Sequence, residues 1–278
     1  SRPWISHRPS DGAWDSGEAF DLDENGWIRS LNPDQEAGTL LMFEIGDNYP
    51  AGRYVCLYEG EGEIHFEWDA EVVSREPGRI VLNVRPQEGI HMVIRSTNPE
   101  NYIRNIRVIM PGFEATHEQQ PFHSTYVAFL GHFSTLRFMD WGQTVENPPG
   151  VWAERTTPAS ATQASLKGVA LEYMIQMANE VGADAWLNVP HTATDEYVEN
   201  MARLIQDRLN PEARIYVEYS NEVWNGDFPQ HAYAREQGLQ RGLSEEPFVA
   251  ALRFYSERSV EVFAIFDRVF GAGDRVVR

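Results

Sequence analysis

Basic residues, cysteines and long apolar runs are all scarce in this chain of 278 residues. Lysine and arginine together number 23, against 42 aspartates and glutamates, which gives a formal net charge of −19. Nucleic acids and anionic membranes bind to basic surfaces, so we expect neither as a partner. No stretch approaches about 18 uninterrupted apolar residues, so we expect no transmembrane helix. The chain opens on Ser1-Arg-Pro-Trp and shows no signal peptide.

Cysteine and cofactor motifs are equally scarce. The single cysteine, Cys56, excludes an internal disulfide, and its apolar surroundings indicate a small core residue rather than a nucleophile. The eight histidines show no H-E-x-x-H spacing, and no G-x-S-x-G, G-x-G-x-x-G or Walker motif is present. These absences argue against a metalloenzyme, a serine hydrolase and a nucleotide-binding protein. We expect no cofactor.

One short segment resembles the opening of a calcium-binding loop. Asp21-Leu-Asp-Glu-Asn-Gly26 matches D-x-D-x-N-G, which makes Asp21, Asp23 and Asn25 candidate calcium ligands. The closing bidentate glutamate is missing, because the twelfth position is Asn32. An Asx turn rich in carboxylates is therefore the favoured interpretation.

Hydrophobicity alternates with a period of two between residues 39 and 110, which predicts short strands. The expected strands cover residues 39–45, 53–58, 63–68, 79–84, 91–95 and 103–110. Their spacing predicts a β-sandwich-like domain over residues 1–110. Such a domain could bind carbohydrate if aromatic side chains were exposed, and the candidates are Tyr49, Tyr54, Tyr58 and Trp68. The alternative is that these aromatics belong to the core.

Residues 111–278 follow a different pattern, in which apolar strands alternate with amphipathic helices. We expect helices near residues 121–133, 163–181, 195–209 and 246–270, and strands over 135–141, 185–191 and from 214 to about 220. This order predicts parallel βαβ units, so the whole chain is α/β plus all-β. The second domain, residues 111–278, would be a partial (β/α)8 TIM barrel.

Each of these three strands ends in residues capable of chemistry: Asp140-Trp141, His191 and Asn221-Glu222. The carboxyl ends of parallel strands share one edge, where such folds place their active sites. Alternation along the third strand puts Glu218 on the same side as Glu222, roughly 13 Å deeper. Polar residues could also simply mark the points where strands emerge into water.

The Asn-Glu pair after an apolar strand, preceded by one strand ending in His191 and another containing Arg137, resembles clan A of the retaining glycoside hydrolases. The resemblance covers about residues 104–278 and implies a (β/α)8 barrel like that of the family 5 cellulases and mannanases. It implies Glu222 as the general acid/base, Asn221 as the ligand of the sugar 2-hydroxyl, and Arg137 as a support for the nucleophile. We expect substrate contacts from Trp141, Trp152, Trp224, Arg155 and Asn188.

The part of the chain that resembles clan A does not include a residue matching the second catalytic carboxylate. Retaining hydrolysis needs two carboxyl groups about 5 to 5.5 Å apart, and clan A supplies the nucleophile after the seventh strand. Only about four barrel strands precede Arg278, so we expect the nucleophile beyond residue 278. Glu218 lies too deep and is expected to pair with a base such as Arg137. Asp140 is the alternative partner, at a separation suited to inversion, about 6.5 to 9.5 Å.

The sequence therefore predicts a retaining glycoside hydrolase, or the acid/base half of one, acting on β-linked polysaccharide such as β-glucan, cellulose or mannan. The alternative is a carbohydrate-binding protein without catalysis. A half-barrel would expose two sheet edges, so we expect a homodimer that completes or covers it. We expect an extracellular or periplasmic location in a bacterium.

Overall fold

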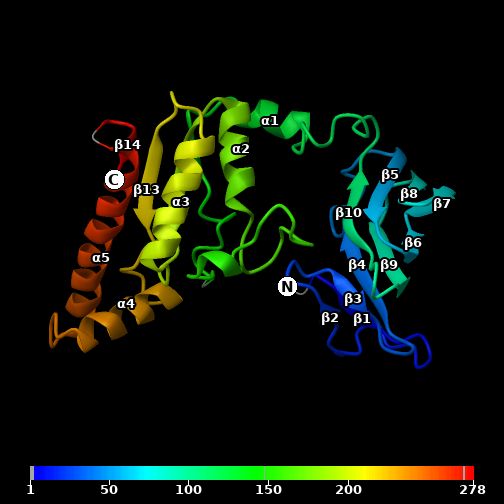
Figure 1. The fold of residues 1–278 in the computed structure, drawn as a ribbon, viewed down its shortest axis with the longest axis horizontal. Coiled ribbons are helices and arrows are strands. Elements are labelled where there is room, and N and C mark those ends of the chain that lie inside the picture. The colour runs from blue at the N-terminus through cyan, green and yellow to red at the C-terminus, as the bar shows by residue number, and fades with distance from the viewer. Residues whose placement is uncertain (1–2, 147, 272) are drawn as a thin grey trace. The chain divides into compact units, whose positions relative to one another are not determined.

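The computed structural model describes residues 3–146, 148–271 and 273–278. The chain forms two compact units (Figure 1). The first takes in the chain as far as Pro121, together with Ala159–Thr162, and so extends past the expected boundary at residue 110. The second takes in Phe122–Pro158 and Gln163–Arg278.

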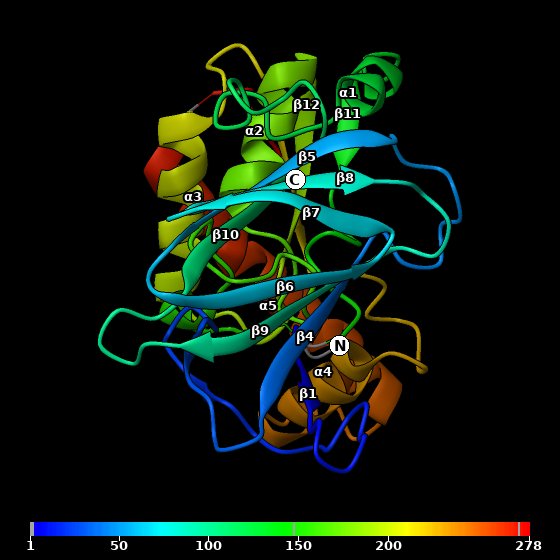
Figure 2. The same ribbon diagram turned by 90° about the vertical axis from the view of Figure 1, so that its right-hand side faces the viewer.

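The first unit contains two four-stranded antiparallel sheets. One has the order β1 (Ile5–His7), β4 (Glu36–Leu41), β9 (Ile90–Thr97), β6 (Gly62–Trp68). The other has the order β10 (Arg104–Ile109), β5 (Gly52–Glu59), β8 (Arg79–Val84), β7 (Ala70–Glu76). Figure 2 shows β5, β8 and β7 side by side in that order. A short hairpin of β2 (Asp21–Leu22) and β3 (Ile28–Ser30) completes the unit.

Both sheets of the first unit contribute to one core, because alternate side chains on their strands point to the same buried cluster. Ile64 and Met92 come from one sheet, and Cys56 and Leu82 from the other. Cys56 is fully buried, and this burial raises the pKa of its thiol to about 12. The interpretation of Cys56 as a core residue is confirmed.

The second unit is built on a four-stranded parallel sheet whose strands lie in chain order. They are β11 (Thr135–Arg137), β12 (Asp184–Val189), β13 (Ile215–Tyr219) and β14 (Val276–Val277). The helices are α1 (Ser124–Leu130), η1 (Trp152–Glu154), α2 (Leu171–Val181), α3 (Asp195–Arg208), α4 (Pro229–Gln240) and α5 (Pro247–Phe270). A half-barrel remains a prediction for this unit.

The two faces of the parallel sheet differ sharply in composition. Leu187 and Val217 belong to the buried face, which shares one apolar cluster with side chains from α2, α3 and α5. The opposite face carries Arg137, Trp186 and Glu218, which are only partly buried or exposed. Because aligned residues on parallel strands point to the same side, these polar and aromatic side chains form one continuous surface.

Several expected elements are shorter than the sequence suggested; the helix expected near residues 121–133, for example, spans only Ser124–Leu130. The helix expected from residue 163 begins only at Leu171. Gly168 has a φ of 80°, and a Cβ there would lie 2.6 Å from the Trp141 carbonyl oxygen, so this segment turns instead of continuing as a helix. The strand expected over 135–141 ends at Arg137, because the chain turns where Gly142 N–H bonds to the Phe138 carbonyl. In the described part of the chain, no helix is both long and apolar enough to cross a membrane.

Candidate functional site at the strand ends

The backbone is strained where β13 ends. Ser220 has a φ of 60° and Glu222 a φ of 41°, on either side of Asn221. Residues with a Cβ rarely adopt positive φ, and such positions persist only where their surroundings enforce them. Strain of this kind is concentrated at active sites and ligand sites, so the turn is the first candidate for function.

Hydrogen bonds enforce the conformation of this turn. Each of the four carbonyl oxygens of residues 220–223 accepts a bond. The donors, in chain order of the carbonyls, are Asn188 Nδ2 at 2.7 Å, Gln230 Nε2 at 2.7 Å, the Asn225 N–H at 2.8 Å and His231 Nδ1 at 2.8 Å. Three of these donors are side chains from β12 and α4, so both neighbouring elements fix the turn.

Arg137, which lies in β11 on the polar face of the parallel sheet, binds the side chain of Asn221. Its Nη2 donates to Asn221 Oδ1 and to Glu218 Oε2, both at 2.8 Å. Trp186 Nε1 also donates to Glu218 Oε2, at 2.9 Å, and the guanidinium of Arg137 lies 4.8 Å from the Trp186 ring centroid. The expected pairing of Glu218 with Arg137 is confirmed. Asn221 is thereby oriented and is buried, and one oxygen of Glu218 accepts two bonds.

Glu222 and Trp224 face solvent. Glu222 is exposed, and its Oε2 accepts a long bond of 3.4 Å from Asn225 Nδ2. The Trp224 side chain is 59% exposed, whereas Val223 between them is buried. The turn therefore presents a carboxylate and an indole while Val223 anchors it in the core.

His191 follows β12 and is only 4% exposed. This burial lowers the pKa of its imidazole to about 4, so the ring is neutral at physiological pH. The Tyr219 hydroxyl donates to the His191 carbonyl oxygen at 2.8 Å. The imidazole ring of His191 packs edge-to-face against the Tyr233 ring, with the ring centroids 5.2 Å apart. His191 Nδ1 has no hydrogen-bond partner in the described part of the chain. The residue lines a hollow of about 570 Å³ together with Thr192, Tyr233 and Arg235.

The remaining predicted site residues lie in other surroundings. Asp140 is exposed in the turn after β11. Trp141 is partly buried against Phe138, and Trp152 packs on Tyr197. Arg155 bonds to Glu172 at 2.7 Å and lies 4.1 Å from the Trp152 ring centroid. Asn188 reaches the site through its bond to the Ser220 carbonyl. Sugar contacts by these residues remain predictions.

The calcium-like segment uses its carboxylate within the protein. Asp23 Oδ1 accepts the backbone N–H groups of Asn25 and Trp27, both at 2.9 Å, and Oδ2 accepts the Tyr102 hydroxyl at 2.8 Å. This is an Asx turn, so the favoured interpretation is confirmed. Asp21 bonds to Ser30 instead. No cluster of three or more metal-ligating His, Cys, Asp or Glu side chains occurs among the described residues.

Gln230 and His231 at the start of α4 were not predicted as site residues. Both side chains bond to carbonyls of the strained turn. Trp186 and Tyr216, whose rings stack at 6.0 Å on the polar face of the sheet, were also missed as site residues. Their positions on alternating strand residues offered one signal, because large aromatics share that face with Glu218.

Comparison of the chain with protein-family models, with curated proteins and with solved structures found no match. The resemblance to clan A glycoside hydrolases therefore rests on the residues of the strand ends alone.

Proposed function

We propose that the strand-end site is the acid/base half of a glycoside hydrolase that acts on β-linked polysaccharide. The observation that carries the proposal is the turn over residues 220–222, where strained backbone exposes Glu222 and buries Asn221. A residue that only marked the end of a strand would need neither positive φ nor four bonded carbonyls. Strain enforced so completely favours a functional role for Glu222.

The proposed chemistry assigns one task to each group. Protonated Glu222 donates to the glycosidic oxygen as the bond to the anomeric carbon breaks, and a carboxylate nucleophile bonds to that carbon. Glu222 then removes a proton from the water that hydrolyses the glycosyl-enzyme. Asn221, held by Arg137, donates its amide N–H to the sugar 2-hydroxyl. His191 is neutral and supplies a hydrogen bond without adding charge.

The second carboxylate is not assigned to a described residue. Glu218 lies within β13, four residues before Glu222, and its Oε2 accepts bonds from Arg137 and Trp186. We assign it to this pairing because it lies too deep in the strand to attack an anomeric carbon next to Glu222. Asp140 remains the alternative partner in an inverting scheme. Glucan, cellulose and mannan are the proposed substrates, since Trp224 offers a flat apolar surface to a neutral pyranose ring.

The test uses the whole protein, together with any sequence or subunit that supplies the nucleophile. It measures both release of reducing ends and binding, on a panel of β-glucans, mannans and xylans. Glu222→Gln should lower turnover on polysaccharide by about 10²- to 10⁴-fold, the usual contribution of a general acid/base, with little change in substrate affinity. Glu180→Gln is the matched control, because Glu180 is also exposed but lies at the C-terminal end of α2.

Aryl glycosides sharpen the test. A dinitrophenolate leaving group needs no proton. The Glu222→Gln variant should therefore keep a much larger fraction of wild-type activity on such a substrate than on polysaccharide. An equal loss on both substrates would contradict the acid/base role. Binding without hydrolysis by the wild-type chain would instead support the alternative of a carbohydrate-binding protein.

A further inference from the structure

The first unit carries exposed aromatic rings on the face of sheet β1-β4-β9-β6 that points away from the core. Trp14 is 49% exposed, and Trp68 and Phe43 are each 43% exposed. The indoles of Trp14 and Trp68 are nearly parallel, with an interplanar angle of 10° and centroids 5.9 Å apart. Phe43 adjoins Trp68 at 6.0 Å. These three side chains are called the Trp14–Trp68 platform below.

Buried histidines support the platform from beneath. The His91 ring lies 4.9 Å from Trp14 and 5.2 Å from Trp68, and only 3% of the residue is exposed. His91 Nε2 is 3.0 Å from His7 Nε2, so the two imidazoles fix each other. Gly38 makes this arrangement possible, since a Cβ there would lie 2.0 Å from His7 Nε2. The rings above are therefore held in place before any ligand arrives.

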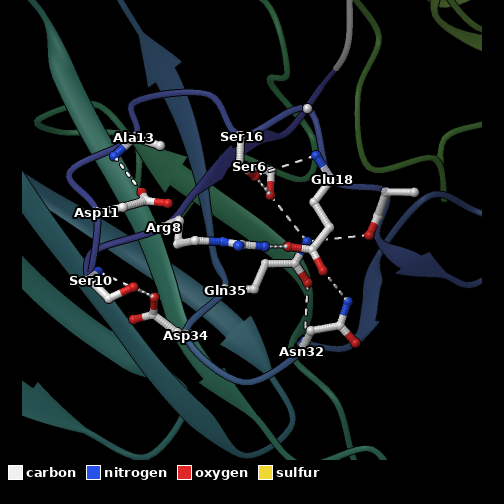
Figure 3. Close-up of polar contacts among 12 residues, drawn as sticks. Ser6, Arg8, Ser10, Asp11, Ala13, Ser16, Glu18, Asn32, Asp34 and Gln35 are labelled. Atoms are coloured by element: carbon white, nitrogen blue, oxygen red, sulfur yellow. Dashed lines mark hydrogen bonds and ion pairs between the residues drawn. The ribbon is translucent and has the colours of Figure 1, made fainter.

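The loop that carries Trp14 is fastened to the sheet by polar contacts (Figure 3). Arg8 bonds to Glu18 at 2.6 Å, and Glu18 accepts a bond of 2.7 Å from Asn32. Ser16 Oγ donates to Ser6 Oγ at 2.9 Å. His7 Nδ1 is 2.5 Å from the Trp14 carbonyl oxygen, so the Trp14 backbone itself is fixed.

Trp68 stands on strained backbone. Its φ is 64°, a conformation that is an outlier for a bulky aromatic residue. The next residue enforces it: Asp69 Oδ2 accepts the backbone N–H groups of Gln87, Glu88 and Gly89 at 2.6 to 2.9 Å. A tryptophan that is both strained and half exposed contributes little to the core, which directs attention to binding.

Planar polar groups continue along the same face beside the rings. Glu67 bonds to His91 Nδ1 and to Arg95 Nη2, each at 3.1 Å, and Arg95 Nε lies 3.3 Å from Glu36. Carboxylates and a guanidinium in fixed positions can pair with the hydroxyl groups at the edge of a sugar ring. Flat rings with oriented polar groups at their rim match the apolar face and polar edge of a pyranose.

We propose that the Trp14–Trp68 platform binds a neutral β-linked glycan, as a site separate from the strand-end site. The charge of the chain, −19, opposes polyanions and is compatible with a neutral glycan, whose apolar face and polar edge match the rings and their rim. Glycan binding at this platform does not require Glu222 or any hydrolysis. Its failure and the failure of the proposed hydrolase are therefore independent results.

The experiment is affinity electrophoresis of the full-length chain in gels containing mixed-linkage β-glucan, glucomannan, arabinoxylan or, as the anionic comparison, polygalacturonate. All variants carry Glu222→Gln, so that cleavage of the polymer does not obscure binding. Trp14→Ala and Trp68→Ala are the test variants. Phe129→Ala is the matched control, because Phe129 is an aromatic residue that is 58% exposed and lies in α1.

We expect retardation by at least one neutral polymer and none by polygalacturonate. Each platform variant should weaken the affinity at least about tenfold, in line with the loss of one stacked ring, while Phe129→Ala leaves it unchanged. No retardation of the Glu222→Gln parent, or equal retardation of the platform variants, would overturn the proposal. Dimers that dissociate on Trp68→Ala, as measured by light scattering, would also overturn it in favour of a protein interface.

Discussion

Glu222 and Trp68 each lie at a strand end on strained backbone, and different contacts hold them in place. Glu222 follows β13 with a φ of 41°, and Trp68 ends β6 with a φ of 64°. Hydrogen bonds to four consecutive carbonyls hold the backbone around Glu222, whereas contacts with the rings of His91 and Trp14 hold the Trp68 ring. The proton transfer proposed for Glu222 needs a defined direction, whereas the stacking proposed for Trp68 needs only a defined plane.

The largest expected effect concerns Asp69, which enforces the conformation at Trp68. Asp69→Ala removes the acceptor of three backbone N–H groups and of the Tyr49 hydroxyl, and should lower the free energy of unfolding by about 3 kcal/mol. Urea denaturation measures the change. Asp47→Ala, at an exposed loop position, should stay within about 0.5 kcal/mol of wild type. Equal stability of the two variants would show that Asp69 does not enforce the turn.

Acid should weaken the strand-end site before the platform. The folded pKa of His191, about 4, lies below its ordinary value of 6.5, so the unfolded chain binds the proton more readily. The contribution of His191 to stability is therefore full above pH 6.5 and falls by roughly 3 kcal/mol as the pH drops toward 4. Urea midpoints measured across this range test the slope, which His191→Phe should abolish.

Asp69 responds in a lower pH window. Burial raises the pKa of this carboxyl, but hydrogen bonds from Tyr49 and from backbone N–H groups outweigh it and leave the pKa below 3.8. Its stabilisation is full above 3.8 and is lost only as the pH falls through the folded pKa. A wild-type midpoint that is constant from pH 6.5 to 4 would contradict this order of events.

A smaller loss is expected at Gln230, which is completely buried and donates to the Asn221 carbonyl. Gln230→Leu leaves that carbonyl without its partner and should cost about 1–3 kcal/mol. If the orientation of the Glu222 carboxylate matters for catalysis, the turnover of Gln230→Leu should fall by more than the decrease in the folded fraction explains. Circular dichroism and initial rates together measure both effects. Gln240→Leu, on the exposed side of the same helix, should change neither.

The smallest stability change is expected for Trp68→Gly. Glycine relieves a conformation that costs an L-residue about 1–2 kcal/mol, which offsets much of the lost ring contact. Thermal unfolding should therefore shift little, while glycan affinity falls as for Trp68→Ala. A strong loss of stability would show that Trp68 serves the core and would weaken the comparison between the two strand ends.

The sequence predicted elements best where one face is buried. Strong alternation identified β5 and β8, and the apolar stripe identified α3, which starts at Asp195 as expected. The edge strand β7, Ala70–Glu76, was missed because most of its side chains are exposed and polar. Helix α4 was missed because few large apolar residues mark its inner side, where Ala234 and Gly238 pack instead.

The candidate sites were only partly predictable for a related reason. Asn221 and Glu222 follow an apolar strand, which the sequence displays, but positive φ and the bonds from Gln230 depend on tertiary contacts. Trp68 was named as a candidate sugar-binding aromatic, whereas Tyr49 and Tyr54 are buried at 7% and 1% exposure. The partner of Trp68 is Trp14, which lies in a loop without periodicity, so no pattern connected the two.

The buried thiol of Cys56 offers a natural probe of local opening in the first unit. A thiol with a pKa near 12 is almost entirely protonated at neutral pH and is shielded from reagents while β5 stays in the core. Because the chain contains no other cysteine, each molecule that reacts with a thiol reagent has opened at this position. The rate of thiol labelling therefore reports the opening of the sheet that contains β5. It needs no engineered probe and does not depend on the conformation of the second unit.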